Sequence, residues 1–365
     1  MFQKGLKDVV AVHTKIADVN GEKGELQYRG VKVGQLVTQH SFEQILYLLL
    51  NGQRPNQEQL QEVQSALIQN RTLPQHVQAI IDALPSEVSL MDAMRTGISA
   101  FCDRDFVRKT SNEQAIQLIA ALPVIVARHY RNQQGLEFIE PDGNLNHTAN
   151  YLWMLTGVSP TEVHVEALET YLKLTMEHGL NASTFAGRVT ISTESDLTAA
   201  ITSAIGTMKG PLHGGAPAGV IDLLNEIGSP EHIQPVIEEK MRRGERIMGF
   251  GHRVYKTEDP RSVILRDKCL SMSGRDAWLD LATTAEKEII RLLDKHKPGR
   301  KLYTNVEYYA AAIMRSIDMP PELFTPTFSV ARIVGWAAHA IEQQQDNTIF
   351  RPQSVYVGAF SEKSC

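Results

Sequence analysis

The amino-acid sequence predicts an all-α protein, and three observations support this prediction. Apolar residues recur at helical spacing through most of the chain, as in the run 197–208. The loops between these runs are short and rich in Pro, Gly, Asn and Asp. The only clear strand pattern lies at the N-terminus, where residues 14–19 and 25–33 flank a turn-forming stretch and predict a small hairpin or meander.

Length and composition describe an ordinary globular protein. A chain of 365 residues exceeds the usual size of a single core, so we expect two domains. A net charge of −5 gives no basic surface for nucleic acid or anionic membrane. No apolar run is long enough to cross a bilayer, and the first residues lack the apolar core of a signal peptide. Three distant cysteines predict a reducing cytoplasm without disulfides.

The predicted helices follow one another with few interruptions. Ser41 begins one of them with a capping box, and Gly52 ends it. Further helices are expected at 57–70, 74–84, 90–101, 112–129 with a bend at Pro123, 147–155, 161–177, 197–208, 238–246, 285–301 and 328–341. The more charged segment 214–319 predicts a smaller domain inserted between the two parts of a larger one, residues 1–213 and 320–365.

The run 208–217 places one imidazole, His213, among glycines. Gly210 and Pro211 end the preceding helix, and the two glycines after His213 leave space for a ligand to reach the ring and the backbone. An ordinary turn with an incidental histidine is the simpler interpretation of this segment when it is taken alone. The small residues of 197–208 predict close packing, either in a central helix pair or at a subunit interface.

A second histidine, His252, also lies in a glycine-containing motif, Gly-Phe-Gly-His-Arg-Val-Tyr-Lys. Asp259 and Pro260 then predict a helix start with Arg261 in its first turn. A helix N-terminus with a guanidinium is typical of an anion site, although a surface arginine is the simpler interpretation. A dinucleotide loop is rejected, because no strand precedes the glycines and no third glycine follows.

Arg332 lies within an apolar helix and should be buried. A buried guanidinium needs a carboxylate, which either a protein side chain or a bound polycarboxylate would supply. Arg351 follows that helix on an exposed tail, as expected of an arm that reaches a neighbouring subunit.

Glu307 is predicted in the first turn of a helix that Asn305 caps. There the helix dipole should keep its carboxylate ionised and able to act as a base. His178 is expected at the end of the helix 161–177, where a histidine is often only a cap.

These motifs together resemble the citrate synthase family. The resemblance rests on Gly-Pro-Leu-His-Gly-Gly-Ala around His213, the His252 motif with Asp-Pro-Arg behind it, Asn-Val-Glu ending at Glu307, and Arg351-Pro352. It runs nearly from end to end, and the compact length is similar to the short bacterial and archaeal type. The resemblance implies an all-α fold of two domains, a homodimer with shared active sites, and a reaction of the tricarboxylic acid cycle.

The resemblance also implies a role for each residue. His213 would polarise the thioester carbonyl of acetyl-CoA while Glu307 removes a methyl proton, and His252 would polarise the ketone of oxaloacetate. The groups expected to hold the substrate carboxylates are Arg261, Arg332, His178 and, from the partner chain, Arg351. The groups expected to contact CoA, which is a substrate here and not a cofactor, are Glu245, Arg246, Ile247, Met248, Gly249, Arg300 and Lys301.

The chemistry agrees with these implied roles. A carboxylate of ordinary pKa, about 4.3, removes a thioester methyl proton only if a donor neutralises the enolate as it forms. A neutral imidazole serves this purpose, as it does in triosephosphate isomerase. One departure stands out: most members of the family have aspartate where this chain has Glu307, so the base is one methylene longer.

Three alternatives stay open. A 2-methylcitrate synthase would share every one of these residues and differ in accepting propionyl-CoA. A metal-dependent hydrolase would use His178, His213 and His252, but their spacings of 35 and 39 residues match no compact ligand motif. A non-catalytic helical scaffold leaves Arg332 and both glycine-flanked histidines unexplained.

Overall fold

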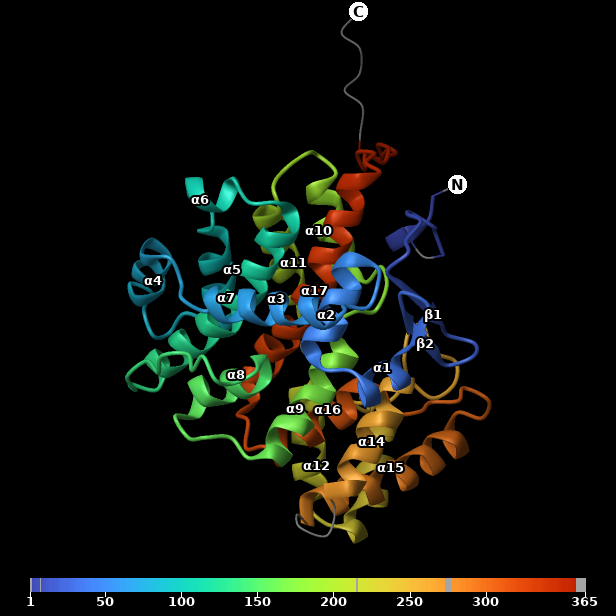
Figure 1. The fold of residues 1–365 in the computed structure, drawn as a ribbon. Helices are drawn as coiled ribbons and strands as arrows, with labels where there is room; N and C mark the ends of the chain where they lie inside the picture. The colour runs from blue at the N-terminus through green and yellow to red at the C-terminus, as the bar shows by residue number, and fades with distance from the viewer. Residues whose placement is uncertain (1, 7, 215, 273–276, 359–365) are drawn as a thin grey trace, which may run out of the picture.

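The structure, a computed structural model, describes residues 2–6, 8–214, 216–272 and 277–358. Within these residues it contains seventeen α-helices and one small antiparallel sheet, so the predicted fold class is confirmed (Figure 1). None of the described helices combines the length and apolar character that crossing a bilayer requires.

The sheet is the N-terminal meander that the sequence predicted. Its strands are β1 (Ala17–Asn20), β2 (Glu25–Tyr28) and β3 (Val31–Lys32), in that order, with Ala17 paired to Tyr28. The predicted second strand was too long. Residue 33 begins helix α1 (Val33–Gln39) instead, because Val33, Leu36 and Val37 recur at helical spacing and are buried together.

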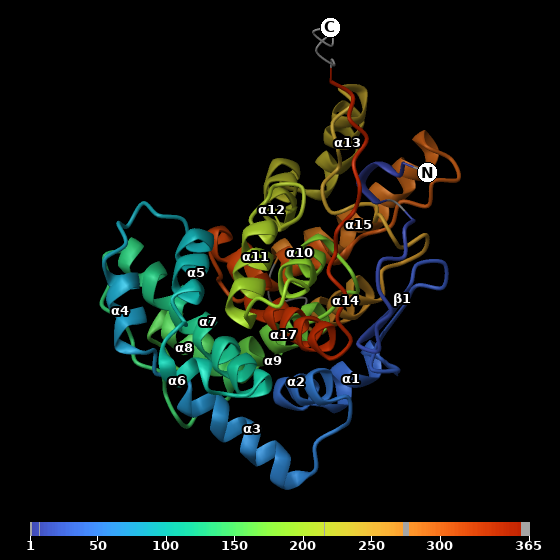
Figure 2. The ribbon, with the colours of Figure 1, turned by 90° about the horizontal axis from the view of Figure 1, so that it is seen from above.

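The long helix α17 (Phe324–Gln345) lies at the centre of the larger group of helices. In Figure 2 it lies among these helices, and it contacts α2, α7, α9, α10 and α11. Its side chains are buried on nearly every face, as its apolar sequence predicted. The helices of this group are α1, α2 (Phe42–Asn51), α3 (Gln57–Gln69), α4 (Gln75–Asp82), α5 (Leu90–Ser99), α6 (Arg104–Val107), α7 (Ser111–Gln133), α8 (His147–Thr156), α9 (Glu162–Thr175), α10 (Ala182–Ile191), α11 (Leu197–Met208) and α17.

Helices α10 and α11 form a closely packed pair. A Cβ atom at Gly187 would lie 3.3 Å from the carbonyl oxygen of Ala200, so the two backbones approach each other at this glycine. Ala200 and Ala204 of the run 197–208 therefore take part in a helix pair, one of the two uses that the sequence left open, and the subunit interface stays a prediction.

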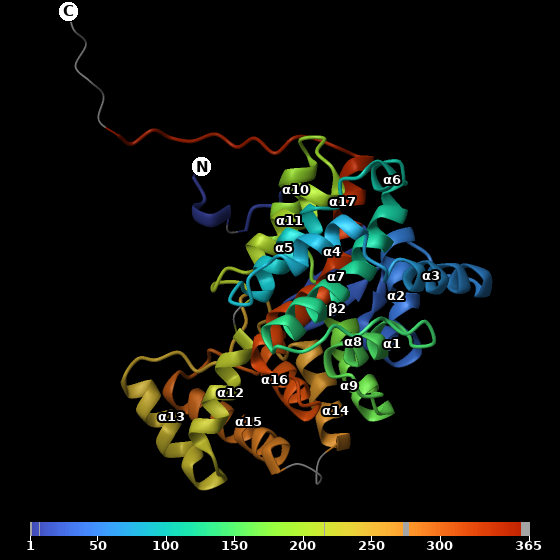
Figure 3. The same cartoon turned by 90° about the vertical axis from the view of Figure 1, so that its left-hand side faces the viewer.

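The remaining helices pack mainly on one another. They are α12 (Ala216–Ile227), α13 (Ile233–Arg242), α14 (Pro260–Met272), α15 (Ala277–His296) and α16 (Val306–Ser316). In Figure 3, α12, α13 and α15 lie together at one end of the molecule. Helices α14 and α16 also contact α9, which joins this group to the larger one.

Several helix ends differ from the predictions. Helix α9 ends at Thr175, so residues 176–181 form a loop to α10. Helix α13 ends at Arg242, because Gly244 adopts a left-handed conformation with φ of 71°. Helix α15 begins at 277 and ends at 296, whereas the sequence predicted it at 285–301. Helix α7 continues through Pro123, and the capping box at Ser41 is present.

Candidate active site

Helix ends and loops that are distant in the sequence converge on one site. Three histidines come from loops: His178 lies between α9 and α10, His213 follows α11, and His252 precedes α14. The other three residues lie on helices: Arg261 in the first turn of α14, Glu307 in the first turn of α16, and Arg332 in the middle of α17. All six lie on or next to helices, so their positions follow from the way these helices pack.

Backbone contacts fix the protonated nitrogen of His252. Its Nδ1 accepts from the backbone N–H groups of Val254 and Tyr255, both at 3.0 Å. Burial lowers the pKa of His252 to about 4, and Arg261 adds to this effect. The ring is therefore neutral at pH 7, and we infer that its proton sits on Nε2. Nε2 lies 3.4 Å from Nη2 of Arg261, so two donors face the same space.

Ser183, at the start of α10, orients the ring of His213. Its backbone N–H donates to Nε2 of His213 at 3.3 Å, and its hydroxyl oxygen lies 2.8 Å from the same nitrogen. Trp336 donates to that hydroxyl at 3.0 Å and holds it in place. Burial lowers the pKa of His213 to about 4, and the charge of Arg332 contributes. The ring is thus neutral, and we infer that Nδ1 carries the proton.

His178 lies beside His252, with ring centroids 5.6 Å apart. Its Nε2 is 3.1 Å from the hydroxyl of Tyr255, which also contacts His252 through its ring. The pKa of His178 lies well below its usual value. Burial is the largest cause of this lowering, and the charges of Arg261 and Arg332 add to it. The histidine follows α9 by three residues and does not cap that helix, so the simple capping interpretation is wrong.

Arg261 is buried and forms a two-bond ion pair with Asp259. Nε donates to Oδ1 at 3.0 Å, and Nη2 donates to Oδ2 at 2.7 Å. Burial acts to lower the pKa of Arg261, but the adjacent carboxylate outweighs it and raises the pKa. Asp259 also accepts from the backbone N–H of Arg261, which confirms the predicted helix start.

Arg332 is buried without a full set of partners. Its Nε donates to the carbonyl oxygen of Thr175 at 2.7 Å, and its guanidinium stacks over the Phe328 ring at 4.7 Å. Its Nη2 is buried and has no hydrogen-bond partner among the described residues. Burial lowers the pKa of Arg332 to about 10, although the charge of Glu177 opposes this shift. No described carboxylate forms an ion pair with Arg332, so the described residues do not provide the first of the two carboxylate sources that the sequence left open.

Glu307 occupies the predicted position but not the predicted ionisation state. Asn305 caps α16 and accepts from the backbone N–H of Glu307 at 3.1 Å. Burial raises the pKa of Glu307 to about 7, against the lowering effects of Arg261 and Arg246. The helix dipole was expected to keep this carboxylate ionised. That expectation is wrong near neutral pH, because the loss of hydration on burial outweighs the stabilisation by the dipole.

The residues predicted to contact CoA lie on two loops near this site. Ile247 is buried, Glu245 and Arg246 are exposed, and Arg246 is close enough to lower the pKa of Glu307. Met248 and Gly249 complete this segment, and a Cβ atom at Gly249 would collide with the Tyr308 ring. The second loop carries Arg300 and Lys301, both exposed.

Arg351 is not part of the site within one chain. It lies on the tail beyond α17, where residues 351–358 are exposed and run away from the helices (Figure 3). In the part of the chain described, no group of three His, Cys, Asp or Glu side chains is arranged to hold a metal ion.

Two residues of the site were missed in the sequence. Tyr255 appeared only as part of a motif, and no spacing rule pointed its hydroxyl toward His178. Ser183 follows Asn181, which caps α10, and this Asn-Ala-Ser-Thr start was a usable signal for a helix whose first turn faces His213.

These features define a class of enzyme. Neutral imidazole donors, a buried guanidinium with a free N–H group and a carboxylate with a pKa near neutrality suit a small polycarboxylate substrate and the removal of a proton from carbon. The comparisons with known proteins agree with this class. Residues 5–353 match the family model described as citrate synthase, C-terminal domain.

Individual relatives are similar over almost the whole chain. Citrate synthase 2 of Bacillus subtilis is 37% identical, covering 99% of this chain and 97% of that protein. Citrate/2-methylcitrate synthase of the same organism is 34% identical, covering 98% and 96%. The ternary complex of citrate synthase from Thermoplasma acidophilum with carboxymethyl coenzyme A and oxaloacetate superimposes with a TM-score of 0.89 at 30% identity, covering 100% and 98%. The chain belongs to the citrate synthase family and is an enzyme of the citrate synthase type.

Proposed function

We propose that the site described above condenses acetyl-CoA with oxaloacetate and then hydrolyses the thioester to give citrate and CoA. The observation that carries this proposal is the buried Nη2 of Arg332, which has no hydrogen-bond partner among the described residues. Burying a donor without a partner is unfavourable in free energy. A substrate carboxylate removes that cost. Oxaloacetate has two carboxylates, and Arg261 lies close enough to share them.

In the condensation Glu307 accepts one proton, and each histidine donates a hydrogen bond to an oxygen that gains negative charge. Glu307 removes a proton from the acetyl methyl group, and Nδ1–H of His213 donates to the thioester oxygen as negative charge develops there. The carbon then attacks the ketone carbon of oxaloacetate, whose oxygen accepts a hydrogen bond from Nε2–H of His252. That oxygen takes up a proton from water to become a hydroxyl, and Glu307 returns its proton to water. Water finally cleaves the citryl thioester, and CoA leaves as the thiol. Both imidazoles are neutral, so each carries a single N–H group and donates it in a hydrogen bond to the oxygen.

Glu307 suits the first step because its pKa of about 7 is close to the working pH. A base of ordinary pKa would be ionised but weak, whereas this carboxylate is about half ionised at neutral pH and more basic. Arg261 and Arg246 stabilise its ionised form enough to keep a useful fraction of base.

We also propose that residues 214–319 act as a small domain that closes over oxaloacetate. His252, Arg261 and Glu307 come from this segment, and His178 and Arg332 come from the larger group of helices, so one ligand would bridge the two. Small-angle scattering with saturating oxaloacetate should show compaction. An unchanged radius of gyration would contradict closure.

A homodimer is the proposed setting for Arg351. On the tail beyond α17, the side chains of Val355 and Val357 are 79% and 93% exposed. Exposed apolar side chains such as these are expected to pack against another protein surface. A neighbouring copy of the chain would cover the tail, and Arg351 of the partner subunit would add a guanidinium to the site.

Purified protein with oxaloacetate and either acetyl-CoA or propionyl-CoA tests the function directly. Release of the CoA thiol should be rapid with acetyl-CoA and should yield citrate. The relative named citrate/2-methylcitrate synthase supports the second candidate, and a higher kcat/KM with propionyl-CoA would favour it. Full activity after treatment with a chelator would contradict the metal-dependent hydrolase.

A further inference from the structure

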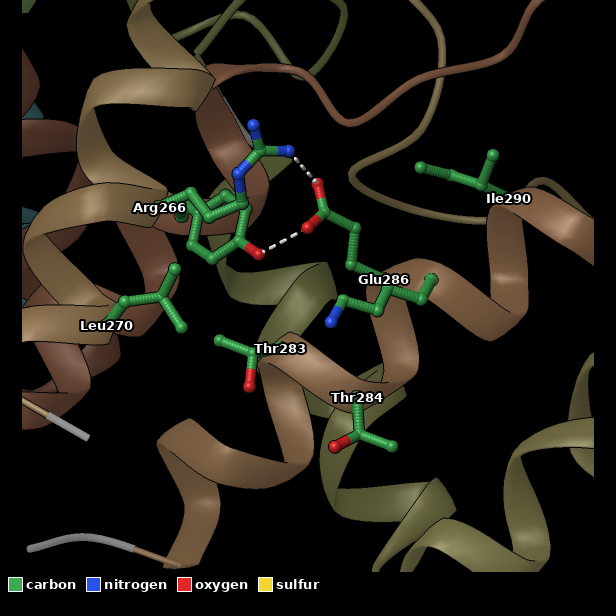
Figure 4. Close-up of a pocket in the computed structure, with 8 residues that line it drawn as sticks. Arg266, Leu270, Thr283, Thr284, Glu286 and Ile290 are labelled. Carbon is green, nitrogen blue, oxygen red and sulfur yellow. Dashed lines mark hydrogen bonds and ion pairs between the residues drawn. The ribbon is translucent and has the colours of Figure 1, made fainter. Parts of the chain in front are cut away.

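A buried carboxylate behind the site links three helices of the segment 214–319. Glu286 on α15 is only 3% exposed. Its Oε1 accepts from the hydroxyl of Thr304 at 2.7 Å, and its Oε2 accepts from the hydroxyl of Tyr309 on α16 at 2.6 Å. Arg266 on α14 approaches Oε1 at 3.4 Å, and Figure 4 shows the two side chains facing each other.

Thr304 connects this carboxylate to the site. Its hydroxyl oxygen accepts from Ser262 at 3.0 Å, so the chain of donors runs from Ser262 through Thr304 to Glu286. Ser262 follows Arg261 directly, and Thr304 immediately precedes Asn305, the cap of α16. Ser262 and Thr304 therefore tie Glu286 to the anion-binding arginine and to the first turn that carries Glu307.

Glu286 has no direct route to the substrates. On its other side it borders a cavity of about 380 Å³, lined also by Leu270, Thr283 and Ile290 between α14 and α15 (Figure 4). None of the residues implied in condensation lines this cavity. Any effect of Glu286 on catalysis must pass through its hydrogen-bonded partners.

We propose that Glu286 is a positioning residue for proton abstraction. By accepting from Thr304 and Tyr309 it fixes both the start and the first turns of α16, and so holds Glu307 against the acetyl methyl group. This inference rests on the proposed role of Glu307. A displacement of about 1 Å at a reacting group costs roughly 10²-fold in rate, so a modest shift of α16 is measurable.

The first test replaces Glu286 with glutamine, which keeps the shape but replaces one acceptor with an N–H donor. In Glu286→Gln, kcat should fall roughly 10- to 100-fold. The deuterium isotope effect with trideuteroacetyl-CoA should rise, because proton abstraction becomes slower, and the KM for oxaloacetate should change little. Glu288→Gln is the matched control. It lies on the same helix and pairs only with Arg291 among the ion pairs of the described residues, so its kinetics should match wild type.

The second test does not depend on the folding of that variant. Thr304→Val deletes the bridging hydroxyl and should reproduce the loss of kcat and the larger isotope effect, whereas Thr304→Ser should restore both. The double variant, Thr304→Val with Glu286→Gln, should be as active as the less active of the two single variants, as expected for one shared pathway.

Two results would overturn the proposal: a folded Glu286→Gln enzyme with wild-type kcat and isotope effect, or a Thr304→Val enzyme with wild-type kinetics. Glu307→Ala, assayed in parallel, separates this failure from a failure of the proposed function. If Glu307→Ala is inactive and Glu286→Gln is normal, only the positioning role of Glu286 is contradicted. If Glu307→Ala is active, the assignment of Glu307 as the base is contradicted.

Discussion

At the scale of single residues, burial sets the protonation states on which the chemistry depends. It lowers the pKa values of His213 and His252 to about 4 and raises that of Glu307 to about 7. The three shifts have the same physical cause, since each favours the neutral form in a site with little water. The result is two neutral donors and one base that gains and loses its proton near the working pH.

This arrangement predicts the pH dependence of the enzyme. Because Glu307 must be ionised to act, kcat/KM for acetyl-CoA should rise with pH through about 7 and level off above it. The histidines stay neutral over this range and add no second acid limb above pH 5. Initial rates between pH 5 and 9 measure the profile. A profile that is nearly flat between pH 5 and 9 would mean that the carboxylate keeps its ordinary pKa.

At the scale of elements, caps and turns were the most predictable features. Ser41, Asn305 and the pair Asp259–Pro260 each start a helix where the sequence placed one. These signals depend only on neighbouring residues in the sequence, so they start a helix regardless of what that helix packs against. The capping start at Asn181 was equally local but was not used, and α10 was missed with it.

The contacts between elements could not be predicted from the sequence. The residue types of the site were identified through motifs, but no local pattern says that Ser183 meets His213 or that Glu286 meets Thr304. The ionisation of Glu307 was predicted wrongly for the same reason. A helix dipole can be seen in the sequence, whereas the burial that outweighs it depends on the folded neighbours.

The packing of α17 against the loop after α9 gives a prediction at this scale. A Cβ atom at Gly335 would lie 2.3 Å from Oε2 of Glu177 and 2.4 Å from the carbonyl oxygen of Met176. Gly335→Ala should therefore lower the free energy of unfolding by about 1–3 kcal/mol. It should also raise the KM for oxaloacetate, because the displaced loop carries His178. Denaturant unfolding and initial rates measure the two effects.

Gly34→Ala in α1 is the control for that substitution. Its new Cβ atom would lie 3.5 Å from Ile264, an ordinary contact, so stability should stay the same or rise. Equal behaviour of the two variants would show that the tight contact at Gly335 does not matter.

At the scale of the whole molecule, the position of Arg351 predicts a site shared between subunits. It lies beyond the last helix, on a tail that leaves the body of its own chain (Figure 3). Arg351→Ala and His213→Ala should each abolish most activity. Mixed and allowed to exchange subunits, they should recover part of it, because a heterodimer has one site with both residues intact. Exchange demonstrated by mass tags without any recovery would argue against a shared site.

The removal of the methyl proton by Glu307 is the central claim, and substitution of that residue tests it most directly. Glu307→Ala should lower kcat by roughly 10²–10⁴, the usual contribution of a positioned general base. Oxaloacetate affinity should change little, since Arg261 and Arg332 dominate it, and Glu307→Asp should be the milder change. The measurement is the rate of CoA thiol release at saturating acetyl-CoA and oxaloacetate. A Glu307→Ala enzyme that condenses at nearly the wild-type rate would show that another group takes the proton.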